Sequence, residues 1–100
     1  MLPHRLQRLP EHAGPDDLRV FTARSPRARL LGLALLEDVP SGCALLIPAC
    51  ASVHTFGMRF AIDIAFLDPS GRVLRIERNV PRRRLVRCRG AAAVMEWRSA

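Results

Sequence analysis

The chain has 100 residues and a formal net charge of +7, and 49% of its residues are apolar. A chain of this length and composition can bury one core, which excludes a multidomain protein and wholesale disorder. All 16 basic residues are Arg, a bias typical of a genome rich in G and C. The positive charge is therefore not by itself evidence of a polyanionic partner, and we do not expect binding to nucleic acid.

The three cysteines, Cys43, Cys50 and Cys88, are an odd number with no closely spaced pair, which argues against a disulfide framework. Residues 1–17 lack the apolar core of a secretory signal, and a later apolar run of seven residues is too short to span a bilayer. These features predict a cytoplasmic protein without a membrane span. Cys43, Cys50 and His54 could supply three zinc ligands, but their spacing matches no zinc motif, so we predict no metal and no cofactor.

Residues 1–16 contain three prolines and no hydrophobic periodicity, which predicts a flexible N-terminal arm. We expect residues 17–100 to form a single domain. Its first element is a strand over residues 18–23, where apolar and polar side chains alternate.

Ser25 and Pro26 begin a predicted helix over about residues 26–36. The Ser hydroxyl can accept from an unpaired amide, and Pro at the first helical position loses no hydrogen bond. Gly32 falls inside this helix, where it costs about 1 kcal/mol relative to Ala. We interpret it as a position where another backbone packs closely.

From Cys43 onward the pattern becomes extended, with a turn at Asp68, Pro69 and Gly71 in which Gly71 supplies a positive φ. Helix, strands and turn together predict a mainly β fold, an antiparallel sandwich or barrel. The predicted strands cover residues 43–48, 52–56, 59–67, 72–78, 83–88 and 92–97.

One carboxylate, Asp63, lies at the centre of the most apolar strand. Alternation places it on the face opposite the predicted core residues Phe60, Ile62, Ile64 and Phe66. A three-residue loop at 69–71 would pair Ile64 with Ile76 and Phe66 with Leu74, so that core residues meet core residues. Asp63 would then face Glu77, with Arg75 one diagonal step away.

Two interpretations of Asp63 stay open. It is either part of a charged sheet patch held by Arg75 and Arg59, or the floor of a recess with His54 at the rim, able to hold a polar ligand or to transfer a proton. The basic segment 81–89 could likewise meet a phosphate or an acidic protein, but Leu85 alternating with Arg residues is typical of a solvated edge strand.

Arg29, Gly32 and Leu33 match an R-x-x-G-L element, and IDIAFLDPSGRVLRI at 62–76 matches a P-L-D-I-x-F-x-D strand followed by a Gly turn and V-x-x-I. In this combination the chain resembles the bacterial and archaeal domain of unknown function 192. HTFGM at 54–58 stands where that family usually has an aromatic residue followed by Met-Lys-Asn-Thr. The resemblance implies a mainly β fold like a jelly roll with one helix, structural roles for Arg29, Gly32, Asp68 and Gly71, and no established reaction.

We predict a non-enzymatic module that binds an unknown small molecule or protein and is a monomer or weak homodimer. Two alternatives remain: a hydrolytic or proton-transfer enzyme using His54 and Asp63, and a structural or assembly protein. A thiol of Cys50 activated by His54 is conceivable but has no support beyond proximity in the sequence. The predicted binding surface comprises His54, Thr55, Met58, Arg59, Asp63 and Arg75.

Overall fold

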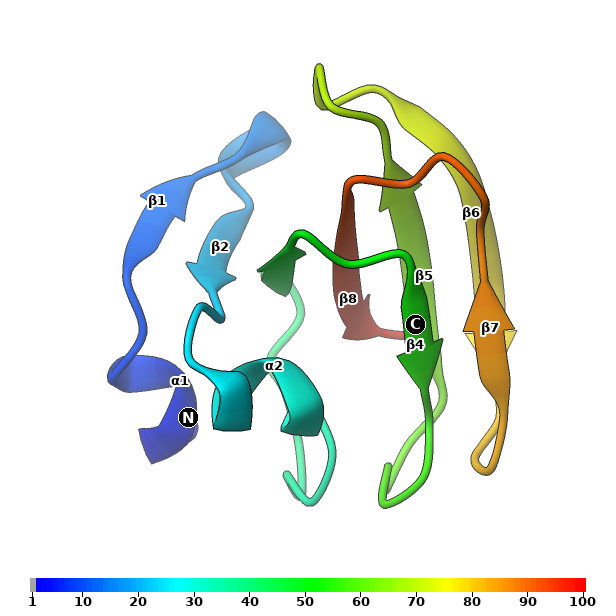
Figure 1. The fold of residues 1–100 in the computed structure, drawn as a ribbon. Helices are drawn as coiled ribbons and strands as arrows, with labels where there is room; N and C mark the ends of the chain where they lie inside the picture. Colours follow the sequence, from blue (N-terminus) through cyan, green and yellow to red (C-terminus); the bar gives the residue numbers. More distant parts are fainter. Residues whose placement is uncertain (1) are drawn as a thin grey trace.

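Six strands of the computed structural model, which describes residues 2–100, form one sheet (Figure 1). In the order in which they lie side by side they are β1 (Glu11–Ala13), β2 (Arg19–Thr22), β3 (Cys43–Pro48), β8 (Ala93–Arg98), β5 (Ile62–Leu67) and β6 (Val73–Val80). β2 and β3 run parallel, and the other neighbouring pairs are antiparallel. A separate antiparallel ribbon pairs β4 (Ser52–His54) with β7 (Leu85–Arg87). The chain is therefore mainly β, as predicted, and the main sheet is not a closed barrel because β1 and β6 are its edges.

The helical segments are short: α1 (His4–Gln7), the 3-10 turn η1 (Pro15–Asp17) and α2 (Pro26–Leu31). In the described residues 2–100, no helix has the length and apolar character needed to cross a bilayer. α1 and β1 lie where the sequence predicted an arm without regular structure. β1 pairs with β2, and Leu6 of α1 is only 2% exposed because it packs in the core.

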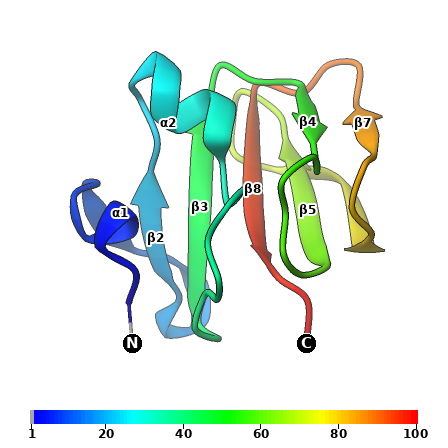
Figure 2. The same cartoon turned by 90° about the horizontal axis from the view of Figure 1, so that it is seen from below.

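The hydrophobic core fills the space between the six-stranded sheet and a layer formed by α2 and the β4–β7 ribbon, which lie on the same side of that sheet (Figures 1 and 2). Successive side chains of a strand point to opposite faces, so alternate residues of the central strands enter this space. In β5 these are the predicted core residues Ile62, Ile64 and Phe66, each 0% exposed. Phe60 is half-buried and packs against the same core.

α2 begins as predicted and ends earlier than predicted. The Ser25 Oγ accepts a hydrogen bond from the Ala28 N–H at 3.1 Å. The helix stops at Leu31 rather than near residue 36, because Gly32 has a φ of +53° and forms the C-cap. Arg29 ties the helix to the loop after β3 by donating from Nη2 to the Ala49 carbonyl at 2.8 Å.

The hairpin loop between β5 and β6 has the predicted three residues, 69–71. The Asp68 N–H donates to the Arg72 carbonyl at 2.8 Å, and Gly71 has a φ of +89°. The Asp68 Oδ1 accepts from the backbone N–H groups of Ser70 and Arg72 and from the Ser70 hydroxyl. A single side chain thus organises the turn, as its position in the sequence indicated.

The predicted pairing beyond this loop was wrong. Phe66 faces Arg75 rather than Leu74, and Ile64 faces Glu77 rather than an aliphatic residue. The strands leave the loop in the predicted register, and the pairing then shifts by one residue between Leu67 and Phe66. A β-bulge that skips one residue of β6 produces such a shift.

The bulge costs little hydrophobic burial, because β6 lies at the edge of the sheet. Its aliphatic side chains stay partly in solvent: Val73 is 54%, Leu74 47% and Ile76 39% exposed. Facing Phe66, Arg75 places its guanidinium carbon 5.2 Å from the ring centroid, a favourable contact between a cation and an aromatic face. The exposed edge position of β6 therefore allows a register other than the predicted match of core residues.

Candidate functional site

His54 and Thr55 lie at the end of β4 and bond to backbone groups of other segments. The His54 Nε2 is 2.8 Å from the Leu30 carbonyl, so it donates to that oxygen, and Nδ1 is buried without a partner among residues 2–100. The Thr55 Oγ1 donates to the Pro81 carbonyl at 2.7 Å and accepts from the Arg84 N–H at 2.8 Å. Both side chains hold the ribbon to its neighbours.

Three other residues of the predicted binding surface are also spread over the fold. Met58 is 2% exposed and belongs to the core. Nη1 of Arg59 is 3.9 Å from Oε1 of Glu37, and this ion pair is weak because it is exposed to solvent. Nε of Arg75 is 3.2 Å from Oε2 of Glu77. The first interpretation expected Arg75 to hold Asp63, but Arg75 pairs with Glu77 instead.

Asp63 is held instead by three groups from β6 and the C-terminal segment. Its Oδ1 accepts from the Ser99 hydroxyl at 2.6 Å and from the Asn79 N–H at 2.9 Å. Its Oδ2 is 3.4 Å from Nη1 of Arg78. Burial alone raises the pKa of this carboxyl, but these partners outweigh it, the Ser99 hydroxyl first, and hold the pKa below its ordinary value. Asp63 is thus a charged anchor that joins β5 to β6 and to the segment after β8.

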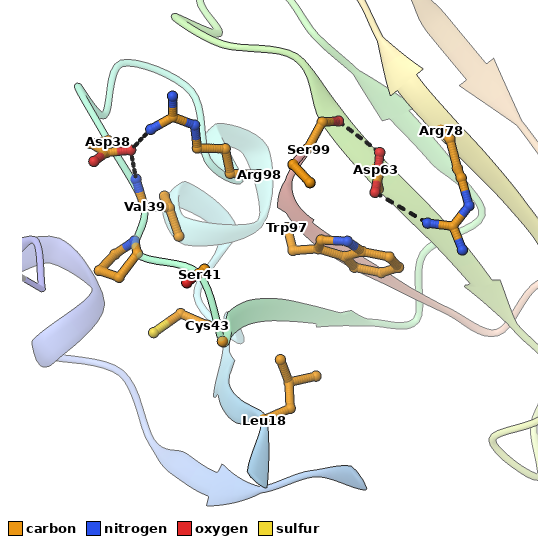
Figure 3. Close-up of a pocket in the computed structure, with 13 residues that line it drawn as sticks. Leu18, Asp38, Val39, Ser41, Cys43, Asp63, Arg78, Trp97, Arg98 and Ser99 are labelled. Carbon is orange, nitrogen blue, oxygen red and sulfur yellow. Dashed lines mark hydrogen bonds and ion pairs between the residues drawn. The ribbon is translucent and has the colours of Figure 1, made fainter. Parts of the chain in front are cut away.

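Asp63 also lines a cavity of about 580 Å³ at the end of the sheet (Figure 3). Of the six residues predicted to bind, only Asp63 is in its wall. The cavity is built from the starts of β2, β3 and β5 and the ends of β6 and β8, which the strand order brings together. It is lined by Leu18, Asp38, Val39, Pro40, Ser41, Gly42, Cys43, Asp63, Arg78, Trp97, Arg98, Ser99 and Ala100.

The polar groups of this cavity lie around an apolar interior. Asp38 forms an ion pair with Arg98, and its Oδ1 also accepts from the Val39 N–H. Figure 3 shows this pair on one side and the group of Asp63, Arg78 and Ser99 on another. The two Asp and two Arg side chains balance in charge, so the cavity is close to neutral overall.

Trp97 is the one aromatic side chain that lines the cavity, and Arg78 is its most exposed donor beside Asp63. The Trp97 indole is half-buried. The Arg78 side chain is 64% exposed and makes one described contact, the pair with Asp63. A guanidinium has five N–H donors, so most of those on Arg78 can serve a ligand.

Glu96 is a second buried carboxylate, on the core side of the sheet, and is 1% exposed. Its Oε1 accepts from the Leu33 N–H at 3.2 Å. A Cβ on Gly32 would lie 2.8 Å from this oxygen, so the close neighbour of Gly32 is a carboxylate and not the backbone that the sequence suggested. Burial raises the Glu96 pKa to about 7, and the Leu33 hydrogen bond offsets only part of that effect.

The sequence analysis did not single out Glu96, Trp97, Arg78 or Ser99. One signal was present for Glu96. Alternation along β8 places it on the same face as Val94, which is 0% exposed. The cavity residues have no comparable pattern, because their segments are distant in sequence.

No three His, Cys, Asp or Glu side chains in the described part of the chain lie close enough to hold a metal ion. The three cysteines are free thiols, with Cys43 buried in the wall of the cavity. The chemistry that the cavity offers is therefore apolar contact, aromatic stacking and hydrogen bonding to guanidinium and hydroxyl groups.

Two solved structures resemble this fold. One, from Novosphingobium aromaticivorans, is a protein of unknown function with a TM-score of 0.73 and 15% identity, and the match covers 100% of this chain and 89% of that one. The other, from Sinorhizobium meliloti, is described as "a putative transcription regulator" and has a TM-score of 0.75 and 17% identity over 89% of this chain and 78% of that one. No curated protein matches the sequence. The family model for domain of unknown function 192 (DUF192), described as "Uncharacterized ACR", matches residues 9–99. The chain therefore belongs to the DUF192 family.

Proposed function

We propose that this domain is a non-enzymatic module that binds a small amphipathic molecule in the cavity beside Asp63. The observation that carries the proposal is the cavity itself. Its volume of about 580 Å³ lies within the range of roughly 300–1,000 Å³ that small-molecule sites occupy. Such sites combine a mainly apolar wall with a few placed polar groups, and this wall has that composition.

The fitting ligand has a planar apolar part and a hydrogen-bond acceptor. The half-buried face of Trp97 supplies a stacking surface. Arg78 supplies donors at the mouth, because Asp63 already orients its guanidinium and engages only one nitrogen. A carbonyl or carboxylate on the ligand would meet these donors, and the apolar wall formed by Leu18 and Val39 would contact the rest.

Binding fits the state of Asp63 better than catalysis does. A general acid or base at neutral pH needs a pKa near 7 and room for the proton it transfers. The Asp63 pKa is lowered, and its oxygens already accept from Ser99, Asn79 and Arg78. His54, the partner that a proton-transfer enzyme would require, is not among the cavity residues and bonds to the Leu30 carbonyl instead.

Fluorescence titration tests this proposal, because Trp97 is the only Trp and the chain has no Tyr. Every intrinsic emission change therefore reports on the cavity wall. We would titrate benzoate, benzamide and toluene, which do not emit in the Trp band, and we expect saturable changes with dissociation constants on the order of 1 mM, as befits ligands of this size. Arg78→Ala should weaken benzoate several-fold and leave toluene, which has no hydrogen-bond acceptor, nearly unchanged.

Arg82→Ala is the matched control, because this exposed Arg lies outside the cavity. Amide shifts in ¹⁵N spectra should cluster at the residues that line the cavity. Shifts that are absent or scattered over the surface, or equal effects of Arg78→Ala and Arg82→Ala on benzoate, would contradict the proposal. Hydrolysis of an ester or amide probe that is lost in Asp63→Asn, with the fold intact, would instead favour an enzyme.

A further inference from the structure

A second cavity, of about 560 Å³, lies between α1 and α2, apart from the cavity beside Asp63. Four of its residues are basic and none is acidic, in contrast to the balanced charges of the first cavity. It is lined by His4, Arg5, Arg8, Leu9, Ser25, Arg27, Ala28 and Leu31.

The wall of this cavity is fixed by packing on both sides. Leu6, next to Arg5 in α1, is 2% exposed in the core, and Leu9 and Ala28 pack against the same core. Arg5 is half-buried, and its Nη2 donates to the Gly32 carbonyl at 2.7 Å. These contacts hold a guanidinium in a defined position at the cavity.

The guanidinium groups at this cavity have no counter-ion among residues 2–100. In the described part of the chain, Arg19, Arg59, Arg75, Arg78 and Arg98 each form an ion pair with a carboxylate. Arg5, Arg8 and Arg27 form none among residues 2–100, and neither do eight Arg residues elsewhere, so the distinctive feature is that three such groups share one cavity wall without an acidic side chain. Burial and the neighbouring charge of Arg27 both lower the pKa of Arg5, so the positive groups are close enough to repel one another.

We infer that this cavity binds a small phosphomonoester, with the phosphate between Arg5 and Arg27 and the organic part against Leu9 and Leu31. The planar fork of a guanidinium matches two phosphate oxygens, and charge-assisted hydrogen bonds of this kind are among the strongest in proteins. A dianion relieves the repulsion among the basic side chains more completely than a monoanion does. The volume of about 560 Å³ accepts one small ligand, and Leu9 and Leu31 give the cavity an apolar side for its organic part.

Calorimetric titration at low ionic strength tests the inference, with glycerol 3-phosphate and inorganic phosphate as ligands and glycerol as the uncharged control. We expect saturable binding of both phosphates and none of glycerol. Arg27→Gln should weaken binding about tenfold, the loss expected for a charge-assisted hydrogen bond. Arg27 is exposed and has no described hydrogen bond to lose, so this variant should fold even if Arg5→Gln does not.

Arg24→Gln is the matched control, because it removes the same charge from an exposed position one residue before Ser25 and outside the cavity. We expect it to weaken binding by less than twofold. Equal weakening by Arg24→Gln and Arg27→Gln, or no saturable binding of either phosphate, would overturn the inference.

A lipid headgroup could present the same phosphate, so a second arm uses vesicles of phosphatidic acid in phosphatidylcholine. Sedimentation with vesicles that glycerol 3-phosphate inhibits and Arg27→Gln reduces would assign the phosphate to a lipid, in support of the same site. The opposite result is sedimentation that neither glycerol 3-phosphate nor Arg27→Gln reduces, together with no calorimetric binding of glycerol 3-phosphate. That result would show a general attraction to a negative surface and would overturn the inference.

Discussion

Glu96→Gln removes a buried charge while keeping the shape of the side chain and an oxygen that can accept from the Leu33 N–H. In the folded chain the pKa of Glu96 is raised to about 7, whereas the ordinary value is 4.5. The physical cause is burial, since the side chain is 1% exposed and one backbone N–H is its only described donor. The substitution therefore tests directly whether the core contains a carboxylate that resists ionisation.

The sign of the effect follows from proton binding in the two states. Below pH about 4.5 the folded and unfolded chains both hold the proton, and Glu96 adds no pH dependence. Between about 4.5 and about 7 the unfolded chain releases it first, so stability falls as pH rises. At roughly 1.4 kcal/mol for each tenfold change in proton affinity, the whole loss is roughly 3 kcal/mol and is complete above pH about 7.

Urea unfolding followed by circular dichroism at about pH 5 and about pH 8 measures this loss. The free energy of unfolding of the native chain should fall by up to about 3 kcal/mol relative to Glu96→Gln between these values. The control is Glu37→Gln, since the Glu37 side chain is 90% exposed and should change little. If the native chain and Glu96→Gln show parallel pH profiles, the argument from burial is refuted.

Three further substitutions test other contacts. Gly32→Ala puts a Cβ on a residue with a φ of +53° and only 2.8 Å from the Glu96 carboxylate. The control is Gly90→Ala, where a φ of +88° also strains the backbone but the Cβ meets no other atom within 4 Å, so Gly32→Ala should lower the free energy of unfolding by about 1–3 kcal/mol more. Equal shifts of the two melting temperatures would contradict this. Asp63→Asn should lower the free energy of unfolding, measured in urea, by about 2 kcal/mol at neutral pH. Because the pKa of Asp63 is lowered in the folded chain, this difference from the native chain should persist as pH falls and disappear only below the ordinary pKa of 3.8. Thr55→Val should lose about 0.5–1.5 kcal/mol in urea unfolding by removing two part-buried hydrogen bonds to the backbone, and an unchanged midpoint would argue against that role.

Features set by a few neighbouring residues could be read from the sequence. The turn at 69–71 follows from Asp68 and Gly71, whose side-chain oxygen and backbone freedom act within five residues. The start of α2 follows from Ser25 in the same way. β3 begins and ends where its apolar run does, at 43–48.

The register of β6 was decided by tertiary structure, because the bulge opposite Phe66 is tolerated only where an edge strand leaves its aliphatic residues half in solvent. Gly32, which ends α2, also lies against a carboxylate 64 residues away in β8, a neighbour that only the packing of distant segments supplies. Glu96 is acceptable inside the core only because that helix end supplies an N–H.

The cavity beside Asp63 was the least predictable feature. Its wall combines residues near positions 18, 40, 63, 78 and 98, and the strand order alone brings them to one end of the sheet. Alternation within one strand placed Asp63 on its face, but it could not say that Ser99 and the Asn79 N–H would reach it. Sequence patterns within one element determine local shape and which face a residue takes, whereas the partners of a buried charge depend on how distant segments pack against one another.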